Sequence, residues 1–210
     1  MWHAKVVRAV AVMAFPLAAL GQASNEELRA ELLEMGKLDQ GVRERIVGLL
    51  RDAGPNSLSS DEFRAPAQEQ QQVDEKNFLR LEEIVRQHGW PSTGLVGEEA
   101  NGVAWLLLQH ANIDRQKQYL ALLRQTATGI KERASVAMLE DEIALAEGGK
   151  QIYGTEITLG NGKAAVAPIV DPAQIDARRA AVGLPPMGEY LRRAESELGM
   201  PVDRSALSAE

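Results

Sequence analysis

The chain of 210 residues has no cysteine, few aromatic residues and no excess of basic residues. Without cysteine it cannot form a disulfide or a cysteine-based zinc site, and it lacks the residue to which bacterial lipoproteins attach lipid. Aromatic residues make up only 4% of the sequence, which argues against a stacking platform for bases or sugars. There are 23 Lys and Arg against 30 Asp and Glu, a formal net charge of −7. Nucleic-acid binding is therefore not expected, because it needs a basic face to neutralise phosphates.

Residues 1–23 have the pattern of a bacterial signal peptide. Two basic residues precede an uncharged, mostly apolar run over residues 9–20. That run is interrupted by Pro16 and is shorter than the roughly 20 residues that a membrane span needs. Small residues then offer cleavage after Gly21 or Ala23. We expect a periplasmic or secreted protein that meets the membrane only through this segment before cleavage, and an uncleaved anchor is the alternative.

The rest of the chain has the hydrophobic content of a globular protein, at 45% for the whole sequence. Apolar residues recur at helical spacing and predict a mainly α (α+β) fold, a compact domain of about six to seven helices. The expected organisation is an N-terminal helix over residues 24–54, a polar linker or loop over 55–73, a helical domain over 74–200 and a flexible tail over 201–210.

One β-hairpin is expected near residues 151–170. Apolar and polar residues alternate from Gln151, and an Asn-Gly pair at residues 161–162 supplies the two-residue turn that hairpins favour. Pro168 places the returning strand at an edge of the sheet, because proline has no N–H to donate to a neighbouring strand.

Two polar residues, Gln109 and His110, close a helix that is predicted over residues 98–111. His110 shares a face with the apolar Val103 and Leu107, so its side chain must find a partner inside the protein. Two interpretations stay open. His110 is a core histidine that holds helices together, or it is a general base or ligand-binding donor in a pocket.

Asp141 and Arg179 also lie on half-apolar helix faces. Asp141 has Ala137 and Leu145 four residues to either side, and a carboxylate in such a place needs a cation or a hydrogen-bond donor. A buried polar cluster is therefore expected, either structural or lining a small binding pocket. Its predicted members are Gln109, His110, Asp141, Tyr153 and Arg179.

Four short motifs together resemble an uncharacterised family of bacterial, often exported, proteins with a domain of unknown function. The motifs are His88-Gly89-Trp90-Pro91, Gln109-His110-Ala111, Tyr153-Gly154-Thr155, and Arg178-Arg179 followed by Gly183-Leu184-Pro185. The resemblance covers residues 74–191 and implies a fold but no activity. The chain departs from the family pattern at Glu142, where the family has Arg, and at Glu156, where it tends to have Gln.

No established catalytic or cofactor motif is present, and we expect no cofactor and no bound metal. A zinc site from His88, His110 and Asp141 is conceivable, although these residues have no known ligand spacing. The sequence favours a binding or interaction module of the cell envelope, with an envelope protein or a small ligand as partner. The alternative is a hydrolase- or lyase-type enzyme that uses His110 as general base with Asp141.

Overall fold

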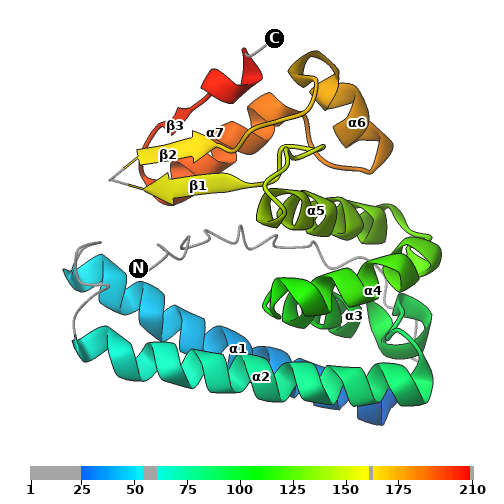
Figure 1. Cartoon of the computed structure of the whole chain (residues 1–210). Helices are drawn as coiled ribbons and strands as arrows, with labels where there is room; N and C mark the ends of the chain where they lie inside the picture. Colours follow the sequence, from blue (N-terminus) through cyan, green and yellow to red (C-terminus); the bar gives the residue numbers. More distant parts are fainter. Residues whose placement is uncertain (1–24, 54–60, 161–162, 209–210) are drawn as a thin grey trace. The chain divides into compact units, whose positions relative to one another are not determined.

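The computed structural model describes residues 25–53, 61–160 and 163–208, and the predicted signal peptide lies outside them. The described residues are mainly helical with one small sheet, which confirms the predicted fold class (Figure 1). None of the described helices combines the length and the apolar character that crossing a membrane requires. In chain order the main elements are α1 (Glu26–Ala53), α2 (Asp61–His88), α3 (Thr93–Gln109), α4 (Ile113–Thr126), α5 (Ile130–Ala146), β1 (Ile157–Gly160), β2 (Lys163–Val166), α6 (Ile175–Ala181), α7 (Met187–Leu198) and β3 (Val202–Asp203).

The described part of the chain forms two compact units, residues 25–116 and residues 117–208. The boundary between them lies inside α4, and not in the polar stretch where the sequence suggested a linker. Each unit has its own packed elements.

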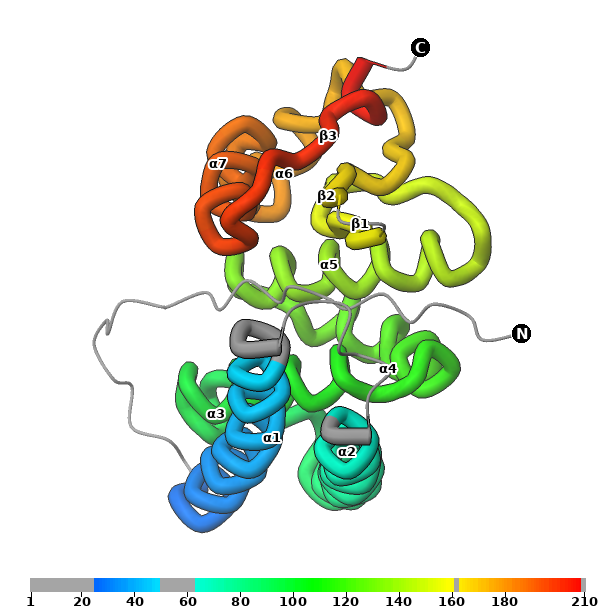
Figure 2. Tube along the Cα trace, turned by 90° about the vertical axis from the view of Figure 1, so that its left-hand side faces the viewer, coloured from blue at the N-terminus to red at the C-terminus, as the bar shows by residue number. Residues whose placement is uncertain are grey.

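The first unit is a helical hairpin with a third helix against it. α1 and α2 run antiparallel side by side, and α3 packs against both of them (Figures 1 and 2). α3 contributes Trp105, which meets Trp90 edge to face with ring centroids 5.1 Å apart. Such a pair adds about 0.5–1.5 kcal/mol to the burial of its apolar surface. The least exposed core side chains of this unit include Leu32, Phe78, Leu81, Ile84, Val96 and Leu108.

The expected loop over residues 55–73 gives way to helix from Asp61 onward, because α2 begins there. The polar stretch is rich in Gln, Glu and Ala, which have good helix propensity, and Phe63 anchors it in the core with only 5% of its surface exposed. Pro66 is the sixth residue of α2 and has no N–H to donate to the carbonyl four residues before it, so the helix continues there with one backbone hydrogen bond fewer. The first half of α2 therefore lacks apolar periodicity because much of its surface faces solvent.

The second unit contains a three-stranded sheet in the order β1-β2-β3. β1 and β2 form the predicted hairpin, with Ile157 opposite Val166, and its Asn-Gly turn lies outside the described residues. β3 pairs with β2 in parallel, with Val202 opposite Ala164. Helix α7 packs against the sheet through an apolar cluster made of Ala164, Val166, Ile169, Ile175, Met187, Leu191 and Val202.

Three details of the predicted hairpin and tail need correction. The first strand begins at Ile157 and not at Gln151, because the side chains of Asp141 and Arg179 bind the backbone of the residues just before it. β2 is the central strand and not an edge, since it ends at Val166, before Pro168. The expected flexible tail over 201–210 contains β3, whose Val202 is 4% exposed.

Candidate functional site

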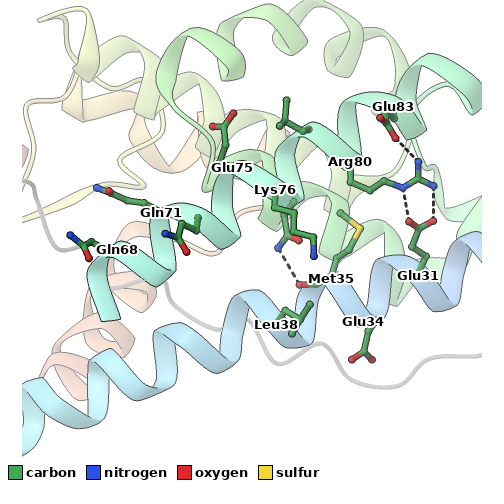
Figure 3. Close-up of a pocket in the computed structure, with 13 residues that line it drawn as sticks. Glu31, Glu34, Met35, Leu38, Gln68, Gln71, Glu75, Lys76, Arg80 and Glu83 are labelled. Carbon is green, nitrogen blue, oxygen red and sulfur yellow. Dashed lines mark hydrogen bonds and ion pairs between the residues drawn. The ribbon is translucent and has the colours of Figure 1, made fainter. Parts of the chain in front are cut away.

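An open groove of about 1240 Å³ runs between α1 and α2 (Figure 3). The lining residues are mainly long polar side chains around a few apolar ones. We call it the α1–α2 groove, and its lining residues are Glu31, Glu34, Met35 and Leu38 of α1 with Gln68, Gln71, Gln72, Glu75, Lys76, Asn77, Leu79, Arg80 and Glu83 of α2. The sequence did not indicate a site on these helices.

The floor of the α1–α2 groove joins its two helices. The Asn77 side chain is buried and donates a hydrogen bond of 3.3 Å to the carbonyl of Met35. Met35, Leu38 and Lys76 lie between the helices in Figure 3. Leu38 and Leu79 are 52% and 48% exposed, which makes them two of the most exposed large apolar residues among those described. The groove therefore offers apolar surface to solvent between charged rims.

Ion pairs fix part of the rim. Arg80 donates to both carboxylate oxygens of Glu31, at 2.5 and 3.0 Å, and to Glu83 at 2.7 Å. The hydrogen bond from Arg80 lowers the pKa of Glu31, so this carboxylate stays charged at neutral pH. Glu75 binds Arg115 through two hydrogen bonds, at 2.6 and 2.7 Å. These pairs hold long side chains in place along one wall of the groove.

His110 takes part in a second polar arrangement in the same unit. Its Nδ1 lies 2.9 Å from Oδ1 of Asp39, a carboxylate that is completely buried. Arg43 donates to the same oxygen at 2.8 Å and also binds both oxygens of Asp74, at 2.9 and 3.2 Å. Asp39 and Arg43 come from α1, Asp74 from α2, and His110 follows α3 directly. The network therefore connects all three helices.

Within the described part of the chain, Asp39, Asp74 and His110 are also the residues that could hold a metal ion, since one ligand atom from each lies within 4.8 Å of the others. Arg43 already binds both carboxylates and supplies the positive charge between them. The arrangement is an Arg-centred network that an ion could enter only by displacing the guanidinium. His88, the other histidine of the zinc site considered as an alternative, is exposed at the end of α2.

The imidazole of His110 is oriented in a way that bases in enzymes share. A carboxylate at Nδ1 holds the ring and leaves Nε2 as the second nitrogen. Nε2 is buried and has no hydrogen-bond partner among the residues that the structure describes. The neighbouring Gln109 contributes its backbone carbonyl, which accepts a hydrogen bond of 2.9 Å from the side chain of Gln116. His110 does not line the α1–α2 groove.

Asp141 binds the backbone of a segment that follows α5. Its carboxylate accepts hydrogen bonds from the N–H groups of Ile152 and Tyr153 at 2.5 and 3.0 Å. It also accepts from the N–H and the hydroxyl of Thr155, at 3.0 and 2.9 Å. Asp141 is 0% exposed, so these donors replace the water that the carboxylate loses. The arrangement fixes the turn around Gly154, where φ is +68°.

Arg179 holds the same segment through its carbonyl groups. Nη1 donates to the carbonyls of Tyr153 and Gly154 at 2.7 and 3.2 Å, and Nε donates to Pro185 at 2.6 Å. The guanidinium carbon lies 4.8 Å from the ring centroid of Tyr190. Complete burial lowers the pKa of Arg179. These contacts explain why the first strand starts only at Ile157, since residues 152–155 have their backbone groups bound elsewhere.

The structure thus brings three of the five predicted cluster residues, Asp141, Tyr153 and Arg179, to one backbone segment of the second unit. Gln109 and His110 belong to the first unit. Sequence reasoning missed Asp39, the acid that His110 contacts. A signal was present, because Asp39 follows Leu32 by seven residues and Met35 by four and so lies on the apolar face of α1.

The two units define a mainly α protein whose buried polar residues connect elements within each unit. The chain belongs to DUF6624, a family of unknown function, whose model matches residues 26–203. The expected resemblance to an uncharacterised family is confirmed by this match. No curated protein and no solved structure matches the chain.

Proposed function

We propose that the chain is an exported protein of the bacterial envelope whose function is to bind a polypeptide partner, and that the α1–α2 groove is its binding surface. The observation that carries the proposal is the half exposure of Leu38 and Leu79 inside a groove of about 1240 Å³. Apolar surface held open between rigid helices is typical of sites that receive a partner's side chains. The pattern of residues 1–23 supports export.

Substitution of the two leucines tests the groove. Leu38→Asp and Leu79→Asp place a charge where a partner would bury apolar surface, and both sites are half exposed, so the fold should tolerate them. Val47→Asp is the matched control. Val47 is 51% exposed on the same helix as Leu38, and nine residues further along it lies about half a turn round the helix.

Photo-crosslinking in the periplasm provides the measurement. A photoreactive residue at position 79 should capture the same polypeptide in repeated experiments, and Leu38→Asp should abolish the capture. Val47→Asp should leave it unchanged. Equal capture by both variants would contradict the groove as the binding surface.

The second candidate is a hydrolase- or lyase-type enzyme with His110 as general base. The contact between His110 Nδ1 and Asp39 favours it, because a base needs such an orienting acid. In this candidate Asp39 takes the orienting role, and the pairing of His110 with Asp141 stays a prediction. Loss of a measured activity in His110→Ala, at a temperature where the variant is still folded, would support the enzyme.

A further inference from the structure

The lining of the α1–α2 groove follows helical periodicity on both walls. On α1 the lining residues recur at steps of three and four, and the same steps recur along α2. The α1 members in this register are Glu31, Glu34, Met35 and Leu38, and the α2 members are Gln68, Gln72, Glu75, Lys76, Leu79 and Glu83. Two such stripes side by side form the kind of surface onto which another helix packs in a bundle.

The length of the longer stripe sets the length of the helix that it fits. Gln68 and Glu83 lie 15 residues apart on α2, which corresponds to about 22 Å at a rise of 1.5 Å per residue. A helix of about four turns covers that distance. Apolar side chains of such a helix would bury Leu38 and Leu79, which lie on opposite walls.

The charge of the first unit determines which kind of partner helix it attracts. Residues 25–116 carry 10 Lys and Arg against 17 Asp and Glu, a formal charge of −7 for the unit that contains the groove. The groove itself is lined by four carboxylates, from Glu31, Glu34, Glu75 and Glu83, and by two cations, from Lys76 and Arg80. The carboxylates pair with Arg80, Lys37 and Arg115, and their side chains stay 36–64% exposed to solvent. A cationic partner is attracted by this unit, whereas a second copy of the chain carries the same charge and is repelled.

We propose that the occupant of the α1–α2 groove is a cationic amphipathic α-helix of a partner polypeptide, with its apolar face on Leu38 and Leu79 and its Lys and Arg side chains toward the acidic rim. This inference rests on the proposed function and names the chemistry of the partner. Binding of this kind reads anchors at i, i+3, i+4 and i+7 along the partner helix.

Three synthetic peptides of about 18 residues test the inference against the mature protein. The first has a Leu face and a Lys face at helical spacing. The second replaces every Lys by Glu, and the third contains the residues of the first in an order that has no amphipathic period. The first peptide should bind saturably in calorimetry and become more helical on binding, and the other two should bind at least about tenfold more weakly.

Protein variants connect the binding to the groove. Leu79→Asp should weaken the first peptide by about tenfold or more, while Val47→Asp leaves the affinity unchanged. Neutralising the rim with Glu34→Gln and Glu83→Gln together should weaken binding more than Glu44→Gln with Glu99→Gln. The control pair also removes two negative charges, but from exposed sites outside the groove.

Each contrary outcome contradicts a different part of the proposal. Equal binding of the Lys and Glu peptides, or of the scrambled one, would show that a cationic amphipathic helix is not selected. Indifference to Leu79→Asp would place the peptide elsewhere, and dimers that Leu38→Asp dissociates would identify a second copy as the occupant. If crosslinking from position 79 still captures one partner while the Lys peptide fails to bind, the proposed function stands and this inference is wrong.

Discussion

Asp141 and Arg179 bind the two backbone polar groups of one residue: the Asp141 carboxylate accepts from the N–H of Tyr153, and the Arg179 guanidinium donates to the Tyr153 carbonyl. The sequence predicts Asp141 and Arg179 in one polar cluster, and in the structure both bind the backbone of the same segment. Each replaces a hydrogen-bond partner that a strand would have supplied. The two residues therefore act on the fold of the second unit through the segment between α5 and β1.

Asp141→Asn should destabilise the protein by about 2–4 kcal/mol, because it removes the charge from a buried acceptor of several hydrogen bonds and turns an amide toward N–H donors. Urea denaturation measures the loss. Glu147→Gln is the control, since Glu147 is an exposed acid at the end of the same helix and pairs with Lys117. Similar stabilities of the two variants would contradict the role given to Asp141.

Alkaline pH should destabilise the second unit through Tyr190. Burial raises the pKa of its hydroxyl to about 12, and the hydroxyl donates a hydrogen bond of 2.6 Å to the Thr155 carbonyl. The unfolded state ionises near pH 10, so between about pH 10 and 12 the folded state holds the proton longer and stability falls as pH rises. Tyr190→Phe should abolish this part of the fall. Absorbance titration and denaturation at pH 9 to 12 would check both statements.

Gly183→Ala should be strongly destabilising. Gly183 has φ +79°, and a Cβ there would lie 2.2 Å from Cγ1 of Ile130. Gly148→Ala separates the two causes, because Gly148 has φ +78° and no atom of the described residues lies within 4 Å of its Cβ position. We expect a loss of about 1 kcal/mol for Gly148→Ala and of at least about 3 kcal/mol for Gly183→Ala. Thermal unfolding of both variants measures the difference.

His110 should be present with a proton on Nδ1, which donates to Asp39. Nitrogen NMR of the imidazole reports the tautomer directly, and His88, which is exposed, gives the reference signal. His110→Ala should cost about 2–4 kcal/mol, because it leaves the Asp39 carboxylate short of a donor. A proton found on Nε2 alone would contradict the assigned contact.

Expression of the full chain in a bacterium should yield a periplasmic protein whose N-terminus is Gln22 or Ser24. Cleavage after Gly21 or Ala23 gives these ends. N-terminal sequencing and cell fractionation provide the measurement, and replacement of the apolar run by charged residues is the control that should retain the full-length chain in the cytoplasm. A membrane-bound product of full length would support the uncleaved anchor.

The sequence predicts the elements whose residues have a clear period. The helix ending at Gln109 and the hairpin around Asn161-Gly162 were found in this way. The first half of α2 was not, since its solvated face carries glutamines and acids without an apolar stripe. The position of β3 also escaped prediction, because pairing with β2 joins residues that are far apart in the sequence.

The candidate sites show the same limit. Apolar neighbours at three and four residues indicated correctly that Asp141 and Arg179 are buried, but burial does not name the partner. The partners of Asp141 are backbone N–H groups, which every residue carries and which no residue type reveals. The α1–α2 groove depends on how two helices pack, and neither helix alone predicts it.

The parallel pairing of β3 with β2 makes the sheet depend on residues that come 36 positions after the strand they cover. A chain shortened before Val202 leaves the side of β2 that β3 covers, at Ala164 and Ala165, without its partner strand. An open strand edge of this kind accepts strands from other molecules and promotes aggregation. A fragment that keeps all the motifs from His88 to Pro185 but lacks β3 should therefore be prone to self-association.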